Sequence, residues 1–519
     1  MTAAVTTAER GQGMKKDFLT KAKRRLESRS FSMTTITVLV LALALFANAF
    51  LYALDEKVGL SVIRPSSSGI TLSGATDTYF DDVKDLRHVT LTFCMPEDEL
   101  SAHTTGSYVL RTAKQLAERY PSFLTLRFVN IITKRDAEGN AVDLSRYEKD
   151  ETGEAVSIKK STVIFESTRH YRVLTDTYST AGFADFFTLN SSGKLVAYNG
   201  EEVLAAMIRF VLADEHKTAY FTSYHGETAD LALRTVLATA GYYIKDLDLR
   251  EKEIPDDAGL VLISAPQSDF EQGAAGSGVR SEIDRLSDYV EKGGNLYVAL
   301  HSYLKRDLPV FSAFLEKYGI RIATTELAGG QTVQNIVKDT DRAITTDGFT
   351  FSSLLSGSAD ADFLARVGRY SENGVLVSHT GRILPAEHLT PLLVTSSSAV
   401  TEAGGGRIDG QGAYTVAAVA EVAGEGTLGH IFVSPSIYLS ASDALTSSKY
   451  ANRDFLFAVF ATYFGAGKMP YGTTLFNLSD NLLENLTMQT AKIYTVIIAA
   501  IPTALCIFAV LYLRRRKNR

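Results

Sequence analysis

The fold of this chain is decided by four apolar runs, AYFTSYHG (219–226), YYIKDLDL (242–249), GLVLISAP (259–266) and NLYVALHS (295–302). Each run is short and rich in β-branched, aromatic or leucine residues, which is typical of a buried strand. The segments 227–240 and 281–292 between them place their apolar residues at helical spacing. This alternation predicts an α/β fold with a doubly wound parallel sheet covered by helices.

The same stretch carries five landmarks in a fixed order: YHGE (224–227), DLDL (246–249), IPDDA (254–258), LISAP (262–266) and YVEKGGNL (289–296). This order resembles the GldG-like (gliding-motility-associated) auxiliary subunits of ABC transporters, a bacterial family whose corresponding turn reads GHGE. Tyr224 stands in place of the first glycine of that turn. The resemblance continues in LTPLLVTS (389–396) and NRDFLFAVFATYF (452–464) and covers roughly residues 75–519.

The resemblance implies a role as a non-ATPase auxiliary subunit that works with a separate ATPase subunit and an ABC-2-type permease. It also implies an extracytoplasmic α/β domain that assists transport or interacts with substrate or envelope components. The sequence itself excludes ATP hydrolysis through a P-loop. The nearest string, GAGKM (465–469), has Thr462 where the first glycine is needed and Met469 where a hydroxyl is needed.

Length and composition indicate a multidomain globular chain. Its 519 residues are 45% hydrophobic, which is enough to build two or three domains with their own cores. The chain has two cysteines, Cys94 and Cys506, so a disulfide scaffold is excluded.

Two segments, 34–54 and 493–513, each hold about twenty residues without a charge, the length that a helix needs to cross a bilayer. The tails 1–33 and 514–519 are basic, which predicts a two-pass protein of the plasma membrane with both termini cytoplasmic and residues 55–492 outside. A cleaved signal peptide is the alternative for the first segment. Subtracting the tails, each +5, from the net charge of −6 leaves −16, which disfavours nucleic-acid binding.

Between the two segments, the order β-α-β-β-β over residues 88–174 is similar to that of a thioredoxin-like fold. The later half resembles flavodoxin- or amidotransferase-like domains. The predicted organisation is a linker (55–74), a thioredoxin-like domain (75–200), a connecting helix (201–217), a doubly wound domain (218–470) with an insertion near 323–385, and a juxtamembrane segment (471–492).

The candidate ligand crevice lies where the predicted strands end, since open α/β sheets bind ligands there. It consists of His225, Glu227, Ser264 and His301. The alternative is structural: Gly226 permits the turn, and Glu227 complements the N-terminus of the following helix.

No cofactor or metal is expected, and five scattered histidines show neither i, i+4 pairing nor HExxH spacing. These histidines are His88, His103, His170, His216 and His388.

Two other functions stay open. The first is a stand-alone, membrane-anchored protein that binds an extracellular glycan or lipid near His225. The second is a surface hydrolase or redox enzyme that uses His301-Ser302 or Cys94. A G-x-S-x-G elbow is absent, and the residues after Cys94 lack the second thiol of a Cys-x-x-Cys motif, so we expect no enzymatic activity.

Overall fold

The computed structural model of the chain describes residues 70–83, 87–176, 182–189, 195–228, 231–273, 280–302, 308–367, 374–424, 426–445, 447, 449–473 and 475–478. All of them belong to one compact unit, Ile70–Ser479. We call residues 70–212 the N-terminal lobe and residues 213–478 the C-terminal lobe.

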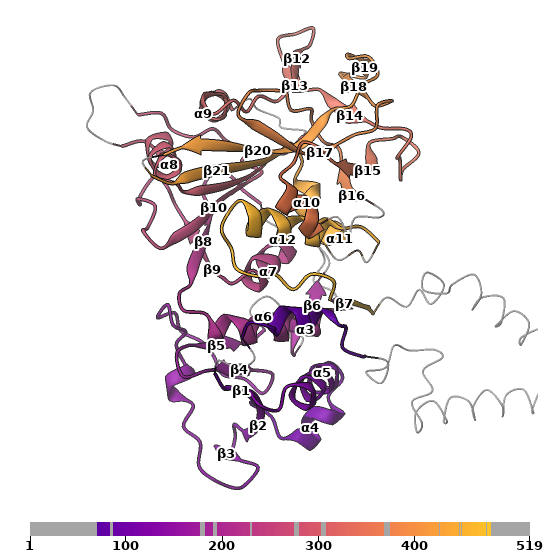
Figure 1. Ribbon diagram of the computed structural model, residues 1–519. Coiled ribbons are helices and arrows are strands. Elements are labelled where there is room, and N and C mark those ends of the chain that lie inside the picture. The colour runs from indigo at the N-terminus through magenta and orange to yellow at the C-terminus, as the bar shows by residue number, and fades with distance from the viewer. Residues whose placement is uncertain are drawn as a thin grey trace, which may run out of the picture. The chain divides into compact units, whose positions relative to one another are not determined.

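The N-terminal lobe contains a five-stranded sheet in the order β3-β2-β1-β4-β5 (Figure 1). Its strands are β1 (Val89–Phe93), β2 (Leu124–Asn130), β3 (Arg135–Asp136), β4 (Val163–Glu166) and β5 (Tyr171–Leu174). β1 is parallel to β2 and antiparallel to β4. A second small sheet joins two further strands of this lobe, β6 (Phe187–Leu189) and β7 (Leu195–Tyr198), to β22 (Phe476–Asn477) of the C-terminal lobe.

Four helices accompany these strands: α3 (Ala75–Phe80), α4 (Glu97–Ala102), α5 (Gly106–Arg119) and α6 (Gly200–Leu212). α5 buries Val109, Leu110, Ala113 and Leu116, which recur at helical spacing. Nearly every residue of α6 is buried, because this helix packs against α5 and β5 of its own lobe and against α7 (Leu231–Thr239) of the C-terminal lobe. The polypeptide therefore passes from one lobe to the other through a buried helix.

The C-terminal lobe is built on a nine-stranded mixed sheet in the order β16-β15-β17-β20-β21-β11-β10-β8-β9. Figure 1 labels the strands of this sheet except β11. The strands are β8 (Lys217–Thr222), β9 (Tyr242–Leu247), β10 (Ala258–Ser264), β11 (Asn295–Ala299), β15 (Thr350–Leu355), β16 (Val375–Ser378), β17 (Leu389–Val394), β20 (Thr415–Ala423) and β21 (Leu428–Ser434). Smaller sheets join β12 (Thr324–Glu326) to β13 (Thr332–Gln334), and β14 (Ile336–Lys338) to β18 (Val400–Ala403) and β19 (Gly406–Arg407).

The prediction of a parallel doubly wound sheet is corrected by this order. Only β9, β8, β10, β11 and β21 are parallel neighbours, whereas β20, β17, β15 and β16 extend the sheet in antiparallel fashion. The physical reason lies in the connections. Only residues 424–427 join β20 to β21, too few for the helical crossover that a parallel pair requires.

The two faces of the sheet bury separate cores because successive side chains point in opposite directions. On one face, Ala219 and Phe221 of β8 join the core made with α7 and α12 (Asn452–Thr462). On the other face, Tyr220 joins the core made with α8 (Glu282–Glu291) and α9 (Pro309–Lys317). Two short helices, α10 (Ala361–Val367) and α11 (Ser442–Leu445), lie on the first face.

The predicted transmembrane helices require a correction. Among the residues that the structure describes, no helix is long and apolar enough to cross a membrane. The longest of them, α5, has 14 residues and is about 21 Å long at 1.5 Å per residue, short of a hydrocarbon layer of about 30 Å. The segments 34–54 and 493–513 and both basic tails lie outside the described residues. The fold class is therefore corrected to a mixed α/β fold, and the predicted two-pass membrane localisation is withdrawn.

Candidate functional site

The parallel strands place the predicted crevice at a point where the strand order reverses. Counted along the chain, the order β9-β8-β10-β11-β21 reads 2-1-3-4-5, which puts the reversal between β8 and β10. His225 and Glu227 follow β8, Ser264 ends β10, and His301 follows β11. The predicted residues thus come from the carboxyl ends of neighbouring strands, where open α/β sheets hold their ligands.

The loops after β8 and β10 are hydrogen-bonded to each other at this crevice. The backbone N–H groups of Gln267 and Ser268 donate to the carbonyl of His225, at 2.7 and 3.1 Å. In the other direction, Thr228 N–H donates to the carbonyl of Ser264 at 2.9 Å, and the Ser264 hydroxyl donates to the carbonyl of Thr228 at 2.7 Å. Gly226 has φ +73°, and a Cβ there would lie 3.1 Å from Gln267 Cβ, so the turn requires glycine.

His225 is occupied by a structural partner. Its Nε2 lies 2.8 Å from Glu282 Oε1, and both residues are buried, with 3% and 1% exposure. The ring of Phe270 stacks on the imidazole with centroids 4.2 Å apart. Burial opposes protonation of His225, but the hydrogen bond and the charge of Glu282 outweigh burial, so the pKa of His225 is raised. The geometry is that of a buried ion pair that fixes the turn to the start of α8.

The other predicted residues have separate surroundings at these strand ends. The carboxylate oxygens of Glu227 are buried without a hydrogen-bond partner. His301 lies half-buried after β11. A cavity of about 1260 Å³ lies nearby, between the end of β11, α9 and residues 320–336, but none of the four predicted residues lines it.

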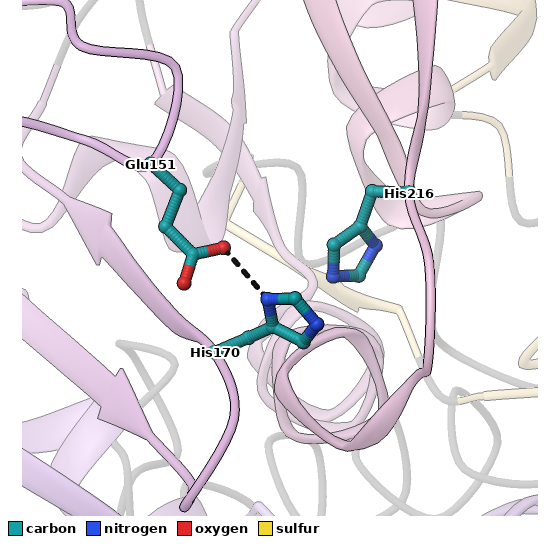
Figure 2. A group of neighbouring side chains, drawn as sticks. All are labelled: Glu151, His170 and His216. Atoms are coloured by element: carbon teal, nitrogen blue, oxygen red, sulfur yellow. Dashed lines mark hydrogen bonds and ion pairs between the residues drawn. The ribbon is translucent and has the colours of Figure 1, made fainter. Parts of the chain in front are cut away.

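A different cluster, formed by Glu151, His170 and His216, comes together where the two lobes meet (Figure 2). Glu151 lies in the loop between β3 and β4, and His170 lies in the turn between β4 and β5. His216 belongs to the short connection between α6 and β8. One ligand atom from each of the three side chains lies within 4.8 Å of the others.

Hydrogen bonds fix the carboxylate of this cluster. Glu151 Oε2 lies 3.0 Å from His170 Nδ1 and accepts a hydrogen bond of 2.8 Å from the Tyr243 hydroxyl. Glu151 Oε1 accepts one of 2.9 Å from the backbone N–H of Tyr171. The side chains of His170 and Glu151 are 23% and 18% exposed, so the cluster is half-buried but reachable from solvent.

His216 is held by packing and lacks a complete set of hydrogen bonds. Its ring stacks on Phe210 with centroids 3.6 Å apart and planes at 4°. Its Nε2 is buried and has no hydrogen-bond partner. Burial, together with the nearby His170, lowers the pKa of His216 to about 4, so its imidazole is neutral at neutral pH.

Neither a family model nor a curated protein matches this chain. Among solved structures, the chain is similar to the mmIFT52 N-terminal domain, with a TM-score of 0.35, 15% identity, and coverage of 49% of this chain and 99% of that one. It is also similar to PurLQS from Thermotoga maritima, with a TM-score of 0.27, 13% identity, and coverage of 47% and 98%. Likenesses this weak carry no argument about the role of this chain.

Sequence reasoning missed the cluster because its members are far apart in the chain. Glu151 and His170 are separated by a loop and a strand, and His216 follows only after the long helix α6. No spacing rule for metal ligands covers such distances. In the sequence, His170 and His216 are only two of several scattered histidines without a motif around them.

Proposed function

We propose that the unit of residues 70–479 is a docking module without enzymatic activity, and that the chain serves as an accessory, non-ATPase subunit of an ABC transporter. The partners are an ATPase subunit and an ABC-2-type permease, as the GldG-like resemblance implies. The observation that carries the proposal is the turn Tyr224–Glu227, in which His225 is paired inward with Glu282 while the aromatic side chain of Tyr224 is exposed on the outside.

Tyr224 is the outward part of this turn. Its side chain is 63% exposed. Its backbone has φ +95°, a conformation that favours glycine, and glycine is the residue at this position in the GHGE turn of the GldG-like family. A bulky residue in such a conformation costs of order 1–3 kcal/mol, and strain of this kind clusters at functional sites. The guanidinium of Arg250 lies over the Tyr224 ring and is held there by Asp248 at 2.6 Å. Tyrosine and arginine are enriched at the centres of protein interfaces.

The rival chemistry finds little support in the site geometry. The hydroxyl of Ser302 is buried and donates to the backbone carbonyl of His379, so no base is positioned to activate it. Cys94 is fully buried, and burial raises the pKa of its thiol to about 12, which disfavours the reactive thiolate. Both observations favour binding over catalysis.

The test is to isolate the tagged full-length chain from its own cells in mild detergent and to identify the proteins that accompany it. We expect an ATPase subunit and a permease. Tyr224→Gly removes the aromatic side chain and relieves the backbone, so we expect it to weaken their recovery by roughly 30-fold, as for a loss of about 2 kcal/mol at an interface centre. Tyr438→Ala, at another exposed tyrosine (39%), is the matched control and should leave recovery unchanged.

Each part of the proposal can fail separately. Full-length protein that is recovered alone, from cells that express such transporter genes, would overturn the subunit role. That result would favour the stand-alone ligand-binding protein, for which the 1260 Å³ cavity is the candidate place. Recovery of both partners with the wild type and with Tyr224→Gly alike would keep the subunit role but refute docking through this turn.

A further inference from the structure

We propose that Glu151, His170 and His216 form a binding site for a divalent transition-metal cation of the Zn²⁺ class, which links the two lobes. The proposal does not depend on the accessory-subunit role. It rests on the donor set, on the distances between the donors, on an unsatisfied buried nitrogen, and on the side chains that orient the donors.

The donor set selects the class of metal. Two imidazoles and one carboxylate are ligands that Zn²⁺ and its neighbours in the transition series accept, whereas Mg²⁺ and Ca²⁺ prefer sites made of oxygen atoms alone. Three protein ligands leave a fourth position of a tetrahedral centre for water or for another ligand.

The distances fit a site that is nearly assembled. Metal–ligand bonds of about 2.0–2.1 Å in a tetrahedron place neighbouring ligand atoms about 3.3 Å apart. His170 Nδ1 and Glu151 Oε2 are already 3.0 Å apart, and one ligand atom from each of the three side chains lies within 4.8 Å of the others. Side-chain rotations that move the ligand atoms by about 1 Å would bring His216 close enough to share a metal ion with Glu151 and His170.

The buried Nε2 of His216 supplies an independent sign. A buried ring nitrogen without a hydrogen-bond partner is uncommon in folded proteins and calls for an explanation such as an ion or a water molecule. The stack on Phe210 holds the imidazole in place without using either of its nitrogens. A metal ion would satisfy a ring nitrogen that the protein itself leaves unused.

The surroundings of Glu151 are those of an oriented metal ligand. The Tyr243 hydroxyl and the Tyr171 N–H bind the two carboxylate oxygens, and such outer contacts commonly fix ligand carboxylates. One nearby charge opposes a cation: Arg172, whose guanidinium lies 5.0 Å from the centroid of Phe210 and 4.9 Å from that of Tyr243. We therefore expect weaker binding than at an all-neutral site of the same ligands.

The ligands come from both lobes, which gives the metal a structural consequence. Glu151 and His170 belong to the N-terminal lobe, whereas His216 and the orienting Tyr243 belong to the C-terminal lobe. A metal ion bound by all three would cross-link the lobes beside the connection from α6 to β8. Because the unfolded chain cannot offer the same preformed site, the ion should also raise the Tm.

The experiment uses the full-length chain with an affinity tag that contains no histidine, freed of metal by a chelator. Titration with Co²⁺ should produce visible d–d absorption that Zn²⁺ abolishes, and calorimetry should show one Zn²⁺ per chain. Glu151→Gln keeps the shape of the side chain and should weaken Zn²⁺ binding at least 10-fold, as should His216→Ala. Tyr243→Phe, which removes only an orienting hydroxyl, should weaken binding by roughly 10-fold. Mg²⁺ should not compete.

His388→Ala is the matched control, because His388 is an exposed histidine outside the cluster, and its Zn²⁺ binding should equal that of the wild type. Far-UV circular dichroism of the metal-free variants verifies that each is folded. The proposal is overturned if the metal-free wild type shows neither Co²⁺ absorption nor a Zn²⁺-dependent rise in Tm. It is also overturned if folded Glu151→Gln and His216→Ala bind Zn²⁺ as tightly as the wild type.

Discussion

The buried pair of His225 and Glu282 allows the sharpest prediction about stability. His225→Ala should lower the free energy of unfolding by about 3–5 kcal/mol, the usual cost of removing one partner of a buried ion pair. The carboxylate of Glu282 would stay buried with only the backbone N–H of Glu271, at 2.8 Å, to compensate its charge. Loss of the stack on Phe270 adds to this cost.

A double-mutant cycle can show that the loss of unfolding free energy comes from the interaction between His225 and Glu282 and not from either side chain alone. Glu282→Gln in the His225→Ala background removes the stranded charge and should restore part of the lost stability. His388→Ala, at an exposed histidine, should change the free energy of unfolding by no more than about 0.5 kcal/mol.

The pH dependence has a definite sign. In the folded state, burial and the charge of Arg250 oppose protonation of His225, whereas Glu282 and Glu227 favour it. The net effect is a raised pKa of His225. The pair therefore contributes its full stability below about pH 6.5, the value for an unfolded chain, and loses it as the pH rises through the folded-state pKa. The difference between wild type and His225→Ala should shrink as the pH is raised.

The assay is urea denaturation of the full-length chain, followed by far-UV circular dichroism because the sequence contains no tryptophan. Two results would refute the reasoning. One is a loss below about 1 kcal/mol for His225→Ala at pH 6, since an uncompensated buried carboxylate costs more than that. The other is strict additivity of the two substitutions.

Three further predictions follow from single residues. In a Cys506→Ser background, Cys94 should react with a thiol reagent only after denaturation, because it is fully buried with a pKa raised to about 12; fast labelling of the native protein would contradict this. Tyr224→Gly should raise the free energy of unfolding by about 1 kcal/mol, because relief of backbone strain exceeds the entropic cost of glycine, and a lower urea midpoint would argue against strain. Burial raises the pKa of Asp454, despite the opposing charge of Arg453, so its contribution to stability is present below about pH 3.8 and is lost as the pH rises; Asp454→Asn should raise the Tm at pH 7 but not near pH 3, and an equal shift at both would count against it.

The parallel half of the large sheet could be predicted from the sequence because its signals are local. The runs at 219–226, 242–249, 259–266 and 295–302 each coincide with a strand, β8, β9, β10 or β11, and each strand is followed or preceded by a helix of clear periodicity. Strands covered on both faces need apolar residues at every position, so the pattern survives in a short window.

The antiparallel half could not be predicted in the same way. β15 reads TFSSLL, and its central serines, Ser352 and Ser353, are buried. The Ser353 hydroxyl donates to the carbonyl of Val375 on the neighbouring strand, so a partner that is distant in sequence compensates its burial. Such a strand looks like a mixed polar segment in hydropathy, so residues 323–385 were predicted only as an insertion in the doubly wound domain.

The histidines of this chain show which sequence signals identify a site and which do not. His225 stood at the expected end of a strand, yet its Nε2 is satisfied by Glu282 and the neighbouring loops are hydrogen-bonded to each other. His216 stood in a connection without any motif, yet its buried Nε2 lacks a partner beside a histidine and a carboxylate. Folding stability accounts fully for the first arrangement, since a buried carboxylate needs a cation. It does not account for the second, because leaving a buried nitrogen unpaired costs stability and brings no benefit to the fold itself. A buried, unpaired ring nitrogen beside two further metal-ligating side chains is therefore a stronger indication of ligand binding in this protein than position at the end of a strand.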